Sequence, residues 1–74
     1  MSANEIRQSV IGFAMFKHRI NKKKLACLLS LSYPTILSKL KDTGSFKISE
    51  ADLLCKVLNI ELTELLNIKN YENE

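Results

Sequence analysis

The chemistry most evident in this sequence belongs to its lysines and arginines, which are distributed unevenly along the chain. Residues 1–41 hold eight Lys and Arg against one acid, a net charge of +7. Residues 42–74 hold three Lys against seven acids, a net charge of −4. A basic half beside an acidic half is typical of a molecule that presents one face to a polyanion. The alternative is that solvated charges are segregated by chance.

The other reactive residue types do not form a site by their spacing. Three acids between residues 42 and 52 are close in sequence, but helix capping and loop solvation explain them better than a metal site or an acid–base pair. His18 has no partner for nucleophilic catalysis and fits a solvated helix end. Cys27 and Cys55 stand alone, so we expect both to be small buried hydrophobes. The sequence therefore predicts no enzyme activity, no cofactor and no metal.

Length and composition predict one small all-α domain. The chain has 74 residues, of which 46% are hydrophobic and 26% charged, with two Gly and one Pro. A domain of this size buries only about 60% of its unfolded surface, so its stability is marginal. We expect a single domain over 1–74, with a core of about 5–67 and a frayed tail at 69–74. No signal peptide and no membrane-spanning run is visible, so a cytoplasmic location and no membrane partner are expected.

Apolar residues recur at i, i+3 and i+4, and capping residues indicate where helices begin. Asn4 or Ser2 can cap the first helix, and Ser2 and Glu5 have the spacing of a capping box. Asn21 is a natural N-cap, and Ser32 or Tyr33 precedes the third helix as its cap. The five helices expected cover residues 5–18, 22–29, 34–41, 50–58 and 62–67. The first helix carries a wide apolar stripe, which we expect the rest of the domain to cover. It comprises Ile6, Val10, Ile11, Phe13, Ala14, Met15 and Phe16.

The last two helices have signals of their own. Ser49 should cap the fourth helix, with Asp52 three residues later as in a capping box. Asn59 can take the left-handed position after that helix, where Asn is second choice to Gly. The inward residues of the second, fourth and fifth helices are expected to be Leu25, Leu28, Leu29, Leu53, Leu54, Val57, Leu58, Leu62, Leu65 and Leu66.

Two short helices joined by a three-residue turn, within residues 21–41, form the arrangement that we expect to carry function. Ala26 is small and lies where the second of these helices must cross the first closely. Leu31 sits in the turn and points back to fill the corner, and Ile36 packs beneath Ala26. A small residue followed by two apolar residues at this spacing is what a helix-turn-helix requires.

These residues resemble the helix-turn-helix of the Cro/XRE repressor family. Leu25-Ala26, Leu31-Ser32, Thr35-Ile36 and Leu40 carry the first part of the resemblance, and the run from Phe46 to Leu66 carries the rest. The resemblance implies a five-helix, lambda-repressor-like domain whose third helix enters the major groove of DNA. It also implies a Cro-like repressor of a phage or mobile-element switch in a bacterial cell. One departure is Ser30, at a turn position that the family usually fills with Gly.

The resemblance also implies which side chains meet DNA. Tyr33, Pro34, Thr35 and Ser38 stand at the family's base-reading positions, although none is a long amide or Arg, so Lys39 and DNA shape are expected to contribute. Lys22 stands where the family often has a Gln that touches a phosphate. The cations expected to flank the groove and bind phosphates are Lys17, Arg19, Lys22, Lys23, Lys41 and Lys47.

Two questions stay open at this level. Tyr33 and Pro34 suit a protein surface as well as DNA, so the alternative function is an antirepressor or modulator that binds a partner repressor protein. A homodimer is expected, at least on a two-fold symmetric operator of double-stranded DNA. Its contacts would come from apolar groups near the end of the chain, such as Ile60, Leu62 and Ile68.

Overall fold

The computed structural model describes residues 2–67, which form five α-helices and one turn of 3-10 helix. No strand occurs within these residues, so the all-α prediction is confirmed, and each predicted helix end lies within two residues of the observed one. The predicted frayed tail at 69–74 lies outside the described residues. The elements are α1 (Ala3–Lys17), α2 (Lys22–Leu28), α3 (Tyr33–Lys41), η1 (Thr43–Ser45), α4 (Ile48–Leu58) and α5 (Leu62–Leu66).

Local capping explains where the first three helices begin. The Ser2 hydroxyl accepts the Glu5 amide at 3.1 Å, and the Glu5 carboxylate accepts the Ser2 amide at 3.1 Å, which confirms the predicted capping box. The Asn21 side chain accepts a backbone N–H of the first turn of α2 at 2.7 Å. Ser32, rather than Tyr33, caps α3. Each cap satisfies an amide that the helix itself leaves without a partner.

The predicted cap of α4 is wrong. Ser49 and Asp52 were expected to form a capping box, but α4 already begins at Ile48 and its N-cap residue is Lys47. The Glu50 carboxylate accepts the backbone N–H of Lys47 at 2.9 Å, which is the reciprocal half of a capping box. The helix therefore starts two residues earlier than its sequence signal.

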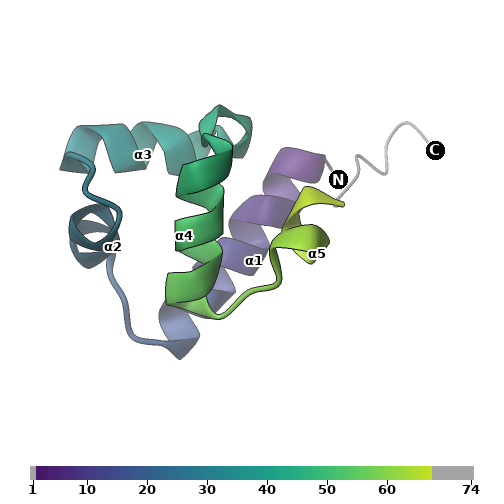
Figure 1. Cartoon of the computed structure of the whole chain (residues 1–74), viewed down its shortest axis with the longest axis horizontal. Helices are drawn as coiled ribbons and strands as arrows, with labels where there is room; N and C mark the ends of the chain where they lie inside the picture. Colours follow the sequence, from purple (N-terminus) through teal and green to yellow (C-terminus); the bar gives the residue numbers. More distant parts are fainter. Residues whose placement is uncertain (1, 68–74) are drawn as a thin grey trace.

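The core joins all five helices. α1 and α4 contribute most of the buried side chains, while α3 contributes the fully buried Ile36. Figure 1 shows α2 and α3 at one end of the molecule and α5 at the other. No helix among residues 2–67 is long and apolar enough to cross a bilayer. The core residues are Ile11, Ala14, Met15, Leu25, Ala26, Leu29, Ile36, Leu54, Cys55, Leu58 and Leu65.

The prediction that α1 is covered by apolar contacts on most sides is wrong for two aromatic residues. Phe13 and Phe16 are 69% and 82% exposed. The reason is that α1 packs through Ile11, Ala14 and Met15, and the two phenylalanines lie on the other side of the helix. Apolar residues surround α1, so its periodicity did not decide which stripe faces inward.

Other expectations of burial fail in the same way. Cys55 is buried, but Cys27 is exposed on α2, so only one cysteine is a core residue. Desolvation by burial raises the pKa of the Cys55 thiol, which keeps it neutral and unreactive. Three leucines expected to point inward are between 39% and 54% exposed, namely Leu28, Leu53 and Leu66.

Candidate nucleic-acid interface

The helix-turn-helix prediction is confirmed in its packing. Ala26 is buried at the crossing of α2 and α3, Ile36 is fully buried, and Leu31 packs against the core from the turn. The Leu31 amide donates to the Ala26 carbonyl at 2.8 Å, which closes the turn. The small Ala26 side chain lets the two helices approach, and so fixes the direction in which α3 leaves the turn.

The turn itself requires a left-handed backbone. Ser30 has φ of 57°, in the region that Gly adopts without steric cost and other residues do not. A non-glycine residue in this region costs about 1 kcal/mol, because its Cβ approaches the backbone. The departure noted in the sequence is therefore a strained serine within an unchanged turn.

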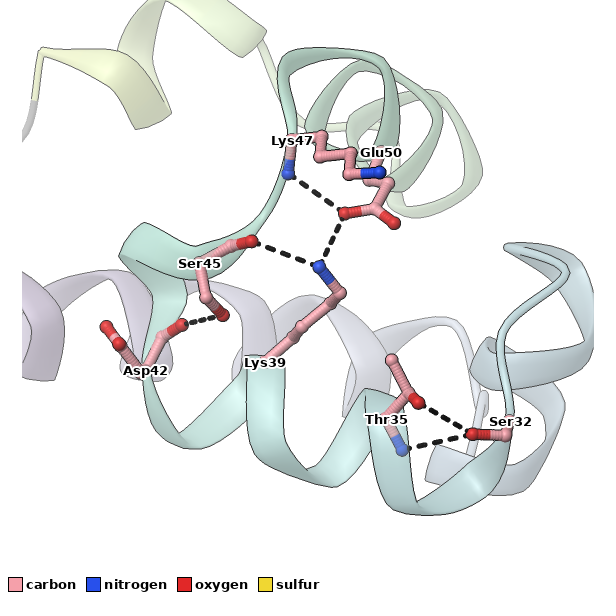
Figure 2. A network of polar contacts seen from close by, with 7 residues as sticks. All are labelled: Ser32, Thr35, Lys39, Asp42, Ser45, Lys47 and Glu50. Atoms are coloured by element: carbon pink, nitrogen blue, oxygen red, sulfur yellow. Dashed lines mark hydrogen bonds and ion pairs between the residues drawn. The ribbon is translucent and has the colours of Figure 1, made fainter.

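The side of α3 that faces away from the core is the first part of the candidate site. Tyr33, Pro34 and Ser38 are exposed, as expected of base-reading residues, and Leu37 is also 36% exposed. Thr35 is half-buried, and its hydroxyl accepts the Ser32 hydroxyl at 2.7 Å. Figure 2 shows this contact at the start of α3. The outward face of the first two turns thus carries no amide, guanidinium or carboxylate side chain.

Lys39 is the predicted base-reading residue that the structure places elsewhere. Its ammonium donates to the Glu50 carboxylate at 2.8 Å and to the Ser45 carbonyl at 3.0 Å, and it lies 5.8 Å from the centroid of the Phe46 ring. Only 14% of the Lys39 side chain is exposed. As Figure 2 shows, Lys39 reaches from α3 to the loop before α4. The Lys39 ammonium is therefore held at the contact between α3 and α4, away from the outward face of α3.

The carboxylate that meets Lys39 is held in its ionised form. The hydrogen bond from Lys39 is the main cause that lowers the pKa of Glu50, followed by the hydrogen bond from the Lys47 amide. One Glu50 oxygen accepts both of these hydrogen bonds. The same side chain therefore caps α4, anchors α3 and orders the loop between them.

The other end of α3 is fixed by Asn4 and Gln8 of α1, a contact that the sequence did not predict, since Asn4 was expected only as a possible cap of its own helix. The last carbonyls of a helix have no partner inside it. Here the Gln8 amide donates to the carbonyls of Leu40 and Lys41 at 3.1 and 2.9 Å, and the Asn4 amide donates to that of Lys41 at 3.0 Å. Asn4 and Gln8 are polar residues near the inward side of an apolar helix, and this is the sequence signal that could have indicated the contact.

The turn after α3 belongs to the same contact with α1. Thr43 is the one buried polar residue within the described chain. Its backbone amide and its hydroxyl donate to the Asn4 side-chain oxygen at 2.8 and 2.6 Å, and its hydroxyl accepts Nε of Arg7 at 2.8 Å. The cation of Arg7 is therefore a structural group at the α1–η1 contact.

The predicted phosphate-binding cations form the second part of the candidate site. All six are exposed, and within residues 2–67 none of them takes part in an ion pair. Lys23 lies 6.0 Å from the centroid of the Tyr33 ring, so it stands beside the start of α3. In chain order they are Lys17 at the end of α1, Arg19 in the turn after it, Lys22 and Lys23 at the start of α2, Lys41 at the end of α3, and Lys47 before α4.

Comparison with known families decides what this arrangement is. Residues 14–70, more than half of the chain, match the Cro/C1-type HTH DNA-binding domain. The chain belongs to the Cro/C1-type HTH DNA-binding family. Comparison with curated proteins and with solved structures gave no match. As a Cro/C1-type protein the chain is a DNA-binding regulator, and the resemblance found in its sequence is confirmed.

Proposed function

We propose that this protein is a sequence-specific transcriptional repressor that places α3 in the major groove of double-stranded DNA. The switch it controls would be that of a phage or mobile element, as in the family that it resembles. The observation that carries this proposal is the exposed outward face of α3 with an exposed cation at each of its ends, Lys23 beside Tyr33 and Lys41 in the last turn. Phosphate contacts fix the position of such a helix on the duplex, and base contacts supply the specificity.

The six exposed cations supply the phosphate contacts in this proposal. If all six act, the logarithm of affinity falls with the logarithm of salt concentration with a slope of about −5 per subunit. Lys39 is left out of this set because its ammonium is bound within the protein.

Base reading falls to the outward side chains of the first two turns of α3. Tyr33, Pro34, Thr35 and Ser38 remain the proposed base-reading residues, and the exposed Leu37 joins them. None can form the bidentate hydrogen bonds by which Arg, Asn or Gln select a purine, whereas apolar side chains contact the 5-methyl group of thymine. The proposed site therefore reads thymine methyl groups, with Ser38 adding one hydrogen bond.

We propose further that the protein binds a two-fold symmetric operator as a homodimer. Two copies related by a two-fold axis present two recognition helices, which reach half-sites about one helical turn apart. Two copies also double the number of phosphate contacts, which compensates for the small area that one short helix can bury.

A second candidate function rests on the apolar character of the α3 surface. Tyr33, Pro34 and Leu37 are exposed together at the start of α3, and such residues suit a protein interface as well as DNA. In that function the protein is a modulator that binds a partner repressor protein through α3. The exposed cations would then serve solubility.

The test is selection from a random duplex library at low salt, followed by sequencing of the bound pool. Enrichment of a two-fold symmetric motif supports the repressor, and Ser38→Ala should then relax the motif at one position in each half-site. Binding without enrichment reduces the site to a phosphate-binding surface and contradicts the sequence-specific function. No binding, together with a stable complex with a repressor in the absence of DNA, supports the second candidate.

A further inference from the structure

The helix-turn-helix has a depression on the side where α1 meets α2 and α3. Three hollows on this side have Met15 in common, and the middle one also shares Lys22 with one neighbour and Asn21 with the other. They therefore form one continuous surface feature, which we call the Met15 trough. It runs from the later turns of α3, across the start of α2, to the turn after α1.

The Met15 trough gathers positive charge without a balancing acid. No Asp or Glu of residues 2–67 lines any of its three hollows. Five of the six predicted phosphate-binding cations do, and all five are exposed. A concave surface lined by charge of one sign raises the local concentration of ions of the opposite sign. The trough thus fits a ligand that carries several negative charges along its length. The five cations are Lys17, Arg19, Lys22, Lys23 and Lys41.

Two exposed aromatic rings line the same trough. Phe16 lines it beside the turn after α1 and is 82% exposed, the highest value among the large apolar side chains of residues 2–67. Tyr33 lines the middle hollow and is 41% exposed, with its ring centroid 6.0 Å from the Lys23 ammonium. Neither ring belongs to the core. Aromatic rings interleaved with cations along a groove are typical of proteins that bind unpaired nucleotides.

The turn after α1 holds the Phe16 residue next to a cation. The Arg19 amide donates to the Phe16 carbonyl at 3.2 Å, and Arg19 has a φ of 55°. Glycine occupies this left-handed position at a helix end without strain, whereas arginine does not. Arg19 therefore lowers the stability of the turn, and it places an exposed guanidinium three residues after Phe16.

Duplex DNA accounts for the cations of the trough but not for the Phe16 ring. The bases of a duplex are stacked on one another and present only their edges in the grooves. In the proposed duplex complex α3 is the helix that enters the groove, so no base is assigned to Phe16 on α1. An unpaired base presents its π-face, and stacking on an exposed ring needs no particular sequence. The Phe16 ring therefore favours a single strand as the ligand.

We propose that the Met15 trough binds single-stranded nucleic acid, with the phosphates beside the five cations and unpaired bases stacked on Phe16 and Tyr33. The cations supply affinity that falls as the salt concentration rises. The rings add stacking, which does not depend on charge. Binding without a fixed sequence follows, because phosphates and base faces are common to all nucleotides.

This inference goes beyond the proposed repressor function and does not rest on it. Ser38, which is proposed to read bases of the duplex, does not line the trough. The cations are common to both ligands, so the Phe16 ring is the group that distinguishes them. The inference is also independent of the proposed homodimer, whose expected contact residue Ile68 lies outside the described residues.

Phe13 provides a matched control for Phe16. It is the same residue type on the same helix, and it is 69% exposed. It lines a separate hollow beside the end of α4 and α5, where Glu61 and Glu64 are among the lining residues. Acids beside a ring repel the phosphates of a strand, so Phe13 should not contribute to single-strand binding.

Titration of the full chain against labelled oligonucleotides of about eight uridines, one DNA and one RNA, tests the proposal by fluorescence anisotropy at low salt. Phe16→Leu should raise the dissociation constant about tenfold or more, because it removes the stacking of one base. Phe13→Leu should leave it within about twofold. A preference for one sugar supports the proposal and identifies the natural ligand as RNA or DNA. No binding of either oligonucleotide, or an equal loss in both variants, overturns it.

The same variants titrated against duplex DNA separate this inference from the proposed function. Phe16→Leu should change duplex binding by no more than about twofold. An equal loss on duplex and on single strand overturns the assignment of Phe16 to unpaired bases. A protein that binds single strands but enriches no operator supports the inference and contradicts the repressor. A protein that binds an operator and no single strand does the reverse.

Phe16→Trp tests the stacking directly, because the chain contains no Trp and this variant therefore has a single indole. A base stacked on the indole should quench its fluorescence, and the affinity should not fall below that of the wild type. Phe13→Trp is the control, and its fluorescence should not change on binding. Unchanged fluorescence of the Phe16→Trp variant in the bound complex overturns the stacking assigned to Phe16.

Discussion

The Lys39 ammonium lies 2.8 Å from the Glu50 carboxylate, so an ion pair joins α3 to the first turn of α4. Both side chains are largely shielded from solvent, at 14% and 16% exposure. The pair therefore contributes more to the stability of the interface than an exposed pair does. It also keeps α3 at a fixed angle to the loop that carries Lys47.

Glu50→Gln should lower the free energy of unfolding by about 1–2 kcal/mol at neutral pH, since it removes a charge-assisted hydrogen bond to Lys39. The pKa of Glu50 is lowered in the folded state, so its contribution is present above its ordinary pKa of 4.5 and is lost as the pH falls through the folded value. Urea unfolding from about pH 6 to about pH 2.5 should show the difference between wild type and variant shrinking toward zero.

Asp52→Asn provides the matched control for this prediction. Asp52 forms an exposed i, i+4 pair with Lys56, at 3.1 Å, and pairs of this kind contribute roughly 0.3–0.5 kcal/mol. The lowered pKa of Glu5 is common to wild type and to both variants, so it cancels in the differences. A Glu50→Gln effect no larger than that of Asp52→Asn, or one independent of pH, contradicts the role given to Glu50.

Ser30→Gly should stabilise the protein, because glycine adopts the observed φ of 57° without strain. We expect a gain of about 1 kcal/mol and a rise in Tm of about 4 °C or more. Ser38→Gly is the control, since the same exchange inside α3 should destabilise by roughly 0.5 kcal/mol. Thermal unfolding followed by circular dichroism measures both. Equal losses in the two variants would show that the turn tolerates serine without strain.

Lys22→Gln should weaken binding to every duplex by a similar factor and reduce the magnitude of the salt slope by about 1. Lys22 is exposed at the start of α2, within the proposed phosphate-binding set. Lys56→Gln is the control, because Lys56 is paired with Asp52 on α4 and lies outside that set. Titration of labelled duplex at several salt concentrations gives both slopes. A change confined to one sequence would assign Lys22 to base reading.

Replacing thymine by deoxyuridine in the selected operator should weaken binding at positions facing α3. Loss of one contacted methyl group costs about 0.8 kcal/mol, or roughly fourfold in affinity. In the Leu37→Ala variant, deoxyuridine at the thymine that Leu37 contacts should no longer reduce the affinity, while deoxyuridine at the other thymines still should. A double-mutant cycle measures this coupling. Deoxyuridine outside the motif is the control. Insensitivity to every thymine, combined with loss on removal of purine N7, would refute methyl reading.

The features that the sequence predicted are those set by neighbouring residues. The caps at Ser2, Asn21 and Ser32 depend on contacts only three residues long, and Asn59 adopts the expected left-handed backbone with φ of 56°. The turn between α2 and α3 needed only the spacing from Ala26. Contacts of this kind join residues that are close in the sequence, so the sequence alone can predict them.

The features that the sequence did not predict depend on contacts between distant segments. α4 starts before its predicted first residue because Lys39 holds Glu50, eleven residues further on in the chain, at the loop before that helix. The same contact directs the Lys39 ammonium toward α4, which the sequence did not predict. On α1, neither periodicity nor hydrophobicity distinguished Phe13 from Met15, because both apolar stripes satisfy the helical repeat and only packing chooses between them.

The hydrogen bonds from Asn4 and Gln8 to the last carbonyls of α3 have a consequence for the thermodynamics of recognition. A nine-residue helix on a protein surface usually frays at its last turn, and a ligand must then order that turn when it binds. Here the order is supplied during folding, by a segment more than thirty residues earlier in the chain. Association with DNA therefore loses less conformational entropy at this end of the helix. A variant that lacks residues 1–8 would bind DNA more weakly, although it keeps every side chain of the proposed DNA contacts.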